Sequence, residues 1–453
     1  MQNHNDMRLL VIGGGPAGHA AATVAATIGV QVTVVEENVI GGAAHLWDCI
    51  PSKAMVASSM RISAIRNAGR LGIDEVGPVH LDMGVLSAHL KGISSKIEHS
   101  MVELLESQGV EMIHGRARLT GPHTAVAETA DGTVSLEFDK VLLSTGSRPW
   151  VPDWATPDER LFTTREVYSL PEQPEHVVVV GSGVTGVEMV HIFSSLGSKV
   201  TLLVSRHHVL PHRDAEVAMV LEDSFIERGV ALLKGSRASG VERTEGGVIV
   251  HTEDGRSIEA SHCLLAVGSV PNSADLGLET AGVETSRGYI PVDEYNVTNV
   301  PHIYAAGDVC GKLPLSSVAT MQGRKIAKYI VGHDVTPLDY RKVAQAIFTE
   351  PEIASVGLEE VDAASEGRKV RITKVPLAAN PRALIQGNAH GFVKVISDPA
   401  TRIVLGGTVV GHHASELIAP IALAVTAHLR VDALLETLMV HPSLVESISE
   451  AAE

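Results

Sequence analysis

The hydrophobic positions at the start of the chain predict a strand, a helix and a second strand. An apolar run at Arg8–Ile12 leads into a glycine-rich turn and an alanine-rich segment that continues to about Gly29. A second apolar run follows at Gln31–Glu36. Short unbroken apolar runs are typical of strands buried on both faces, and alanine favours helix. This order therefore predicts a parallel βαβ unit.

The same pattern returns in the middle of the chain. Residues 177–180 form an apolar run, a second glycine-rich turn follows, a helical pattern continues to about Leu196, and Lys199–Val204 again resembles a strand. Each unit is closed later by an apolar strand that enters a turn of small residues, at residues 140–149 and 263–272. Such an internal repeat predicts two copies of one doubly wound α/β fold.

The region between the two units predicts supporting elements. Helical patterns at residues 54–68 and 83–108 are explained by a packed helical hairpin. Strand-like runs follow at residues 110–113 and 124–128, and Pro149 then suggests a crossing between domains.

A segment of mixed character begins near residue 343. It contains strand patterns at residues 391–396 and 404–410 and helical patterns at residues 414–427 and 433–438. The predicted fold class is therefore α/β, with two Rossmann-like dinucleotide-binding domains and an α+β C-terminal domain.

Composition narrows the class of protein. A chain of 453 residues is too long for one ordinary domain, and 45% hydrophobic with 20% charged residues is typical of a globular protein. The formal net charge of −17 argues against a nucleic-acid or anionic-membrane partner. Aromatic residues make up only 3%, so a binding wall of stacked rings is not expected.

The ends and the cysteines suggest a cytoplasmic protein. The first seven residues are polar, the apolar run at residues 9–12 is too short for a signal peptide, and no run approaches the ~20 residues needed to span a bilayer. The three cysteines, Cys49, Cys263 and Cys310, are widely spaced and show no zinc pattern, which suits a reducing compartment. We expect no metal site, and we interpret Cys263 and Cys310 as structural.

The first glycine-rich turn predicts a bound dinucleotide. It contains the motif G-x-G-x-x-G at Gly13, Gly15 and Gly18. These glycines permit the tight turn, let the backbone approach a pyrophosphate and let the helix pack on the strand. Glu36 ends the second strand 18 residues after Gly18 (36 − 18), where a carboxylate can accept the hydroxyls of an adenosine ribose.

The second turn carries the same motif, but different residues follow its second strand. Its glycines are Gly181, Gly183 and Gly186. The position 18 residues after Gly186 is Val204 (186 + 18), so no carboxylate is present there to repel a 2′-phosphate. Ser205 and Arg206 follow, with Arg213 nearby in the sequence, and arginine pairs well with phosphate. NADPH should therefore be accepted, alongside NADH, although Arg206 as a solvated loop charge is the alternative.

Together these motifs resemble the pyridine nucleotide–disulfide oxidoreductases, the family of lipoamide dehydrogenase, glutathione reductase and soluble transhydrogenase. Residues 41–53 resemble the family's redox segment Gly-Gly-x-Cys-x4-Cys-x-Pro-Ser-Lys, but Ala44 replaces the first cysteine and only Cys49 remains. Residues 304–308 match its Tyr-Ala-Ala-Gly-Asp segment, and residues 441–446 match its His-Pro-x-x-x-Glu dyad. The resemblance extends over nearly the whole chain.

The resemblance implies a domain order and a set of cofactor contacts. It predicts an FAD-binding domain at residues 1–150, an NAD(P)-binding domain at 151–271, a central segment at 272–340 that completes the FAD domain, and a dimerisation domain at 341–453. The implied FAD-binding residues are Gly13, Gly15, Gly18, Glu36, Gly42, Lys53, Ala117, Thr145, Gly146 and Asp308. Those assigned to the second unit are Gly181, Gly183, Gly186, Ser205, Arg206 and Gly268.

The resemblance also implies five catalytic residues. Lys53 and Glu188 would form an ion pair beside the flavin, where a fixed cation stabilises the charge brought by hydride. Cys49 matches the flavin-proximal cysteine, although an inert buried thiol is the simpler interpretation. His441 and Glu446 would reach the active site from the partner subunit of a homodimer, with the carboxylate orienting the imidazole. A purely structural histidine is the alternative.

Three candidate functions are compatible with the absence of the first redox cysteine. The first is an FAD-dependent NAD(P)H:quinone oxidoreductase, because electrons must leave directly from the flavin, and a branch of the family without the first cysteine resembles this chain. The second is a soluble NAD(P) transhydrogenase, whose family members keep the first cysteine and lose the second. The third is a flavin-binding partner protein without catalysis. Lipoamide dehydrogenase activity is disfavoured, because a dithiol substrate needs an exchange disulfide.

Overall fold

The computed structural model describes residues 6–66, 68–73, 77, 79 and 81–453. The chain divides into two compact units, and the sequence passes between them five times. Unit 1 comprises Met1–Ser52, Gly84–Trp150 and Gly268–Leu338. Unit 2 comprises Lys53–Met83, Val151–Val267 and Asp339–Glu453. One boundary falls inside helix α2, which runs over Ile50–Arg66.

Unit 1 is built on a parallel five-stranded sheet in the order β18-β7-β1-β2-β3. The strands are Ile303–Ala305 (β18), Lys140–Leu143 (β7), Arg8–Ile12 (β1), Gln31–Glu36 (β2) and Glu111–His114 (β3). The helices are Pro16–Thr27 (α1), Met83–Ser107 (α3) and Ser316–Tyr329 (α6), with short turns at Leu278–Ala281 (η4) and Asp308–Cys310 (η5).

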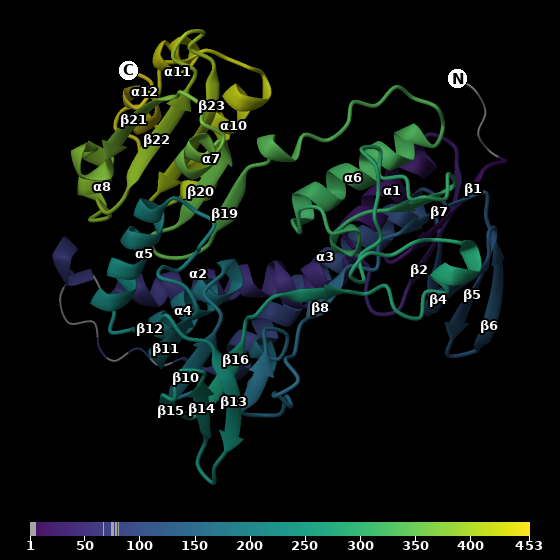
Figure 1. Cartoon of the computed structure of the whole chain (residues 1–453), viewed down its shortest axis with the longest axis horizontal. Coiled ribbons are helices and arrows are strands. Elements are labelled where there is room, and N and C mark those ends of the chain that lie inside the picture. The colour runs from purple at the N-terminus through teal and green to yellow at the C-terminus, as the bar shows by residue number, and fades with distance from the viewer. Residues whose placement is uncertain (1–5, 67, 74–76, 78, 80) are drawn as a thin grey trace. The chain divides into compact units, whose positions relative to one another are not determined.

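Two cores cover the two faces of this sheet. On one face, Leu9 and Val11 pack with the apolar residues of α1 and α6, which lie side by side in Figure 1. On the other face, Leu10 and Ile12 pack with an antiparallel sheet. That sheet comprises Arg116–Gly121 (β4), Thr124–Thr129 (β5) and Gly132–Glu137 (β6). A two-stranded ribbon pairs Ser147–Pro149 (β8) with Ser269–Pro271 (β17).

Unit 2 contains the second copy of the dinucleotide fold. Its parallel sheet has the order β12-β11-β10-β16-β9. The strands are Ala231–Lys234 (β12), Lys199–Val204 (β11), His176–Val180 (β10), His262–Leu265 (β16) and Leu161–Thr163 (β9). The helices are Val184–Leu196 (α4) and Ala215–Glu227 (α5), and the antiparallel ribbon is Ala238–Arg243 (β13), Val248–Thr252 (β14) and Ser257–Ala260 (β15).

The C-terminal part of unit 2 is an α+β domain, as predicted. Its five-stranded antiparallel sheet comprises Gln345–Ile347 (β19), Ile353–Gly357 (β20), Val404–Val410 (β23), Phe392–Ser397 (β22) and Arg371–Pro376 (β21). The helices are Glu360–Ser365 (α7), Pro381–Ile385 (α8), Ala414–Leu417 (α9), Ala419–Thr426 (α10), Val431–Leu435 (α11) and Glu446–Glu450 (α12). Short 3₁₀ turns in unit 2 are Ala68–Leu71 (η2), Val167–Ser169 (η3), Tyr340–Lys342 (η6) and Leu377–Ala379 (η7).

The single helix predicted at residues 414–427 is instead divided into α9 and α10. The division falls at Ile418, two residues before Pro420, which lies in the first turn of α10. Proline is well tolerated in a first turn but not inside a helix, so the proline marks a new start.

A buried lysine joins the C-terminal domain to the second dinucleotide fold within unit 2. The Lys394 side chain is fully buried on β22, with Nζ 2.9 Å from Asp214 Oδ2 and 2.6 Å from Glu360 Oε1, and it also binds Glu216. Burial alone would lower the pKa of Lys394, but hydrogen bonds to these three carboxylates raise it above its ordinary value. The three carboxylates converge as metal ligands can, but an ammonium group already lies among them.

Helices α1 and α6 approach so closely that one residue must be glycine. A Cβ atom added at Gly323 of α6 would overlap the carbonyl oxygen of Ala17 in α1. Backbone cannot yield as the end of a flexible side chain can, so the substitution Gly323→Ala must push the helices apart.

We expect Gly323→Ala to destabilise unit 1 by about 1–3 kcal/mol, the usual cost of overpacking. The measurement is the thermal release of flavin, followed by its fluorescence. Gly92→Ala is the matched control, because Gly92 lies inside α3 with open space around its Cβ position, and alanine there should be neutral or stabilising. Equal melting temperatures for Gly323→Ala and the wild type would show that this contact is not tight.

Candidate active site

The first glycine turn forms a cradle at the carboxyl end of the unit 1 sheet. β1 ends at Ile12, and a Cβ on Gly18 would overlap the carbonyl oxygen of Gly13, so turn and helix are in direct contact. A Cβ on Gly15 would instead meet nothing within 4 Å, which leaves the backbone open where α1 begins. An open turn at a helix N-terminus fits a pyrophosphate. Gly42 packs on this turn, with its Cβ position 3.1 Å from the Gly15 Cα.

Glu36 lies beside the cradle at the end of β2. Its Oε2 accepts the Gly14 N–H at 2.7 Å, and its Oε1 accepts the Asn38 N–H at 2.8 Å. Burial raises the pKa of Glu36, and the two backbone donors oppose that rise. The carboxylate is therefore held by the turn itself, at the place where the sequence predicts contact with a ribose.

Three of the other residues assigned to FAD follow strands at the same edge of unit 1, whereas Lys53 belongs to unit 2. Asp308 follows β18 and accepts a 2.6 Å hydrogen bond from the Ser147 hydroxyl. Thr145 donates to the Asn272 carbonyl oxygen at 2.6 Å, and Gly146 follows with φ +70°. Ala117 differs, because its side chain is buried in the core between the two sheets. Only its backbone can face a ligand.

The segment with the missing cysteine is helical rather than a loop. Ala44–Asp48 forms one π-helical turn (η1), which leads through Cys49 into α2. The Ala44 side chain is buried, and Cys49 is half-buried with Sγ 3.1 Å from the Ser316 hydroxyl at the start of α6. π-helical turns are frequent at functional sites.

None of the three cysteines, all of which lie in the described part of the chain, forms a disulfide. Cys263 is buried in β16, where desolvation raises its pKa to about 12. Cys310 is buried in η5, and desolvation raises its pKa as well. Neither thiol forms a disulfide with Cys49, so the chain contains no dithiol centre.

Lys53 and Glu188 come together within unit 2. Lys53 Nζ lies 2.9 Å from Glu188 Oε2, and the Glu188 side chain is almost completely buried in the first turns of α4. The second oxygen, Oε1, accepts the backbone N–H of Phe348 at 3.0 Å. The Phe348 ring centroid is 4.9 Å from Lys53 Nζ. Phe348 could not be predicted from the sequence, because a backbone donor has no sequence motif.

The second glycine turn repeats the first in unit 2. A Cβ on Gly186 would overlap the Gly181 carbonyl oxygen, and a Cβ on Gly183 would meet nothing within 4 Å. Gly268, also assigned to the nicotinamide cofactor, falls in unit 1, where its carbonyl oxygen accepts the Trp150 N–H.

An exposed arginine follows the end of β11. Ser205 and Arg206 are exposed directly after Val204. Glu222 lies near the following loop, but it is buried and accepts the Val209 N–H at 2.9 Å and Lys234 Nζ at 2.6 Å. Its charge is therefore already compensated.

Arg213, which is near Arg206 in the sequence, is engaged by the C-terminal domain. It forms an ion pair with Glu359 and donates to the Ser355 hydroxyl at 2.7 Å and the Gln345 side chain at 2.8 Å. These partners all lie in the C-terminal domain, so Arg213 connects the two parts of unit 2.

His441 and Glu446 form a hydrogen-bonded dyad within one chain. His441 Nδ1 lies 2.9 Å from Glu446 Oε1, and Glu446 Oε2 accepts the Ser443 N–H at 2.8 Å. The Ser443 N–H, followed by His441, lowers the pKa of Glu446. A carboxylate at Nδ1 requires a proton on that nitrogen, so Nε2 is the ring atom available for proton transfer. The imidazole is exposed, with 71% of its side-chain surface accessible.

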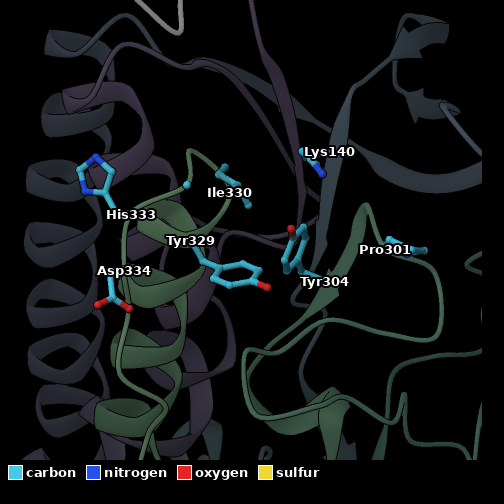
Figure 2. A pocket seen from close by; sticks show the side chains of 8 residues that line it. Lys140, Pro301, Tyr304, Tyr329, Ile330, His333 and Asp334 are labelled. Carbon is cyan, nitrogen blue, oxygen red and sulfur yellow. The ribbon is translucent and has the colours of Figure 1, made fainter. Parts of the chain in front are cut away.

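A pocket of about 500 Å³ lies elsewhere in unit 1, as Figure 2 shows. Its lining includes Lys140 at the start of β7, together with Tyr304 and Tyr329. Ligands of parallel α/β sheets bind at the carboxyl ends of the strands. This pocket lies at the opposite end of β7, and none of the predicted site residues lines it.

Two open glycine turns, one in each unit, together with the C-terminal α+β domain, define an oxidoreductase that uses two dinucleotides. Comparison with known sequences supports this class. Residues 7–323 match pyridine nucleotide-disulphide oxidoreductase, and residues 343–452 match the dimerisation domain of the same family. The chain belongs to the pyridine nucleotide–disulphide oxidoreductase family, whose members use FAD and NAD(P)H.

Similar proteins extend over almost the whole chain. NAD(P)H dehydrogenase (quinone) of Mycobacterium tuberculosis strain H37Rv is 45% identical over 460 residues, which cover 98% of this chain and 93% of the relative. Dihydrolipoyl dehydrogenase of Haloferax volcanii is 36% identical, with 98% and 95% covered. The crystal structure of LpdA from Mycobacterium tuberculosis aligns with a TM-score of 0.94 at 44% identity, with 98% and 99% covered.

These relatives identify the chain as a flavin-dependent NAD(P)H oxidoreductase. In the part of the chain that the structure describes, no helix combines the length and apolar character needed to cross a bilayer.

Proposed function

We propose that the protein is an FAD-dependent NAD(P)H:quinone oxidoreductase that works without a redox disulfide. The observation that carries the proposal is Ala44 at the position of the first redox cysteine, with Cys49 in no disulfide. Bound FAD would supply a two-electron carrier that takes hydride from NAD(P)H and passes it directly to the acceptor. The relative named NAD(P)H dehydrogenase (quinone), at 45% identity, supports a quinone as that acceptor.

The residues of the chain would hold charge and protons for this reaction. Lys53 is paired with Glu188, and in this role its ammonium group would supply a positive charge beside the flavin. A quinone that accepts hydride still needs one proton on an oxygen. In the homodimer that the dimerisation domain supports, His441 would donate this proton from Nε2, with Glu446 holding the ring.

The nicotinamide site should accept both NADPH and NADH. The exposed Arg206 would pair with a 2′-phosphate, and the charge of Glu222, the carboxylate near the following loop, is engaged by Lys234. Dithiol substrates are not expected despite the relatives named dihydrolipoyl dehydrogenase. Exchange with a dithiol requires the second sulfur that Ala44 lacks.

The function is tested by steady-state turnover of the purified flavoprotein with NADPH or NADH. Menadione, dihydrolipoamide and an NAD analogue are offered in parallel as second substrates. We expect menadione to be reduced and dihydrolipoamide to be inert. The variant Cys49→Ser should keep menadione reduction within about threefold of the wild type, because no sulfur relay takes part.

Lys53→Met is the contrasting control, since it removes the fixed cation and should lower menadione turnover by at least roughly tenfold. Rapid transfer between nucleotides without menadione reduction would contradict the proposal and favour a transhydrogenase. Loss of turnover in Cys49→Ser with FAD still bound would show that the thiol is essential.

The choice of nicotinamide cofactor is tested with a variant at Arg206. Arg206→Ala should raise the KM for NADPH about tenfold and leave the KM for NADH nearly unchanged, since charge-assisted hydrogen bonds to phosphate contribute about 1.5 kcal/mol or more. Arg237→Ala, which removes an exposed charge of the same domain, is the matched control. Equal changes for both cofactors would assign Arg206 to the solvent-exposed loop surface only.

A further inference from the structure

The segment after β19 contacts both members of the Lys53–Glu188 pair. The backbone N–H of Phe348 donates to Glu188 Oε1 at 3.0 Å, while Lys53 binds Oε2 at 2.9 Å. The Glu188 carboxylate is only 4% exposed, so these two donors replace almost all of its lost hydration. The orientation of this carboxylate therefore depends on Phe348 as well as on Lys53.

The ring of Phe348 faces the cation of the same pair. Lys53 Nζ lies 4.9 Å from the ring centroid, within the range of a cation–π contact. About a third of the Lys53 side chain is exposed, so Glu188 alone leaves part of its ammonium group unrestrained. The aromatic face of Phe348 restricts the movement of the ammonium group on a second side.

The segment is also fixed at its other end, near the same helix. The Glu350 carbonyl oxygen accepts the Ser224 hydroxyl at 2.6 Å and Arg228 Nη2 at 3.3 Å. Arg228 in turn donates to Nδ1 of His191 at 3.0 Å, and His191 lies three residues after Glu188 on α4. Residues 348–350 are thus attached to α4 at two points, directly at Glu188 and through Arg228 at His191.

The electrostatics of His191 suit this attachment. The imidazole is fully buried, and burial together with Arg228 lowers its pKa to about 3. Nδ1 of a neutral imidazole can accept a hydrogen bond from Arg228, whereas Nδ1 of a protonated imidazole could not. The second attachment therefore persists at neutral pH.

We infer that Phe348 is a positioning residue for the Lys53–Glu188 pair, through which the C-terminal domain sets the place of the cation. Its backbone N–H orients the carboxylate, and its ring confines the ammonium. The inference rests on the proposed function only in that the pair is taken to act beside the flavin. The contacts themselves lie within unit 2 and involve no ligand.

The test uses variants at Phe348 in the purified holoenzyme and in the flavin-free protein. Phe348→Leu removes the aromatic face and keeps the backbone donor, and Phe348→Tyr keeps both. Phe392→Leu is the matched control, because Phe392 makes the same kind of contact with Lys374 and Lys394 in the same domain but has no contact with Lys53. If Phe348→Leu does not fold, Phe348→Met offers the same comparison.

The first measurement is the rate at which an amine-specific acylating reagent labels Lys53, determined by mass spectrometry relative to the exposed Lys91. Labelling needs neither NADPH nor a quinone. We expect Phe348→Leu to raise the Lys53 rate roughly three- to tenfold, because the ammonium loses one restraining contact. Phe348→Tyr and Phe392→Leu should label Lys53 at the wild-type rate.

The second measurement is the rate of flavin reduction by NADPH without an acceptor, in a stopped-flow instrument. Phe348→Leu should slow this step roughly three- to thirtyfold with little change in the apparent affinity for NADPH. Phe348→Tyr should restore it. Unchanged Lys53 labelling in Phe348→Leu, or a Phe348→Tyr variant as altered as Phe348→Leu, would overturn the inference. Failure of menadione turnover in the wild type would reject only the proposed function, since neither measurement uses a quinone.

Discussion

The burial of the Glu188 carboxylate is the constraint on which the arrangement of the candidate active site depends. A buried charge without partners would cost several kcal/mol, so each oxygen must be satisfied by the protein. Lys53 and the Phe348 N–H meet this need, and they come from α2 and from the segment that begins the C-terminal domain. One buried carboxylate therefore joins three elements that are distant in the sequence. The same carboxylate also binds the ammonium group of Lys53.

The absence of the first redox cysteine leaves the other residues of the candidate active site in place. Ala44 is buried within a π-helical turn, so the segment folds without the disulfide that the family name implies. Both glycine turns remain open, and the His441–Glu446 dyad remains hydrogen-bonded. The protein therefore keeps the residues that would bind two dinucleotides and move a proton, while a dithiol relay is chemically impossible. This combination supports direct transfer to a diffusible acceptor.

Most of the fold could be predicted, because its strands are unbroken apolar runs bounded by glycine. β1, β2, β11 and β23 begin and end at the predicted residues. The break at Ile418 was missed because the apolar pattern continues through it. In the site, motif residues such as Lys53 could be placed from their spacing. Phe348 could not, because its contribution is a backbone donor, and neither could the partners of Arg213, because they are distant in the sequence.

The central claim is that flavin is the sole redox centre of this protein. The most direct measurement is an anaerobic reductive titration of the purified enzyme, with the electrons taken up counted for each bound FAD. A flavin paired with a redox disulfide accepts four electrons, whereas a flavin alone accepts two, because a disulfide adds one two-electron couple. Because Cys49 forms no disulfide and Ala44 stands at the position of the second sulfur, we predict two electrons for each FAD. An uptake of four would contradict the account.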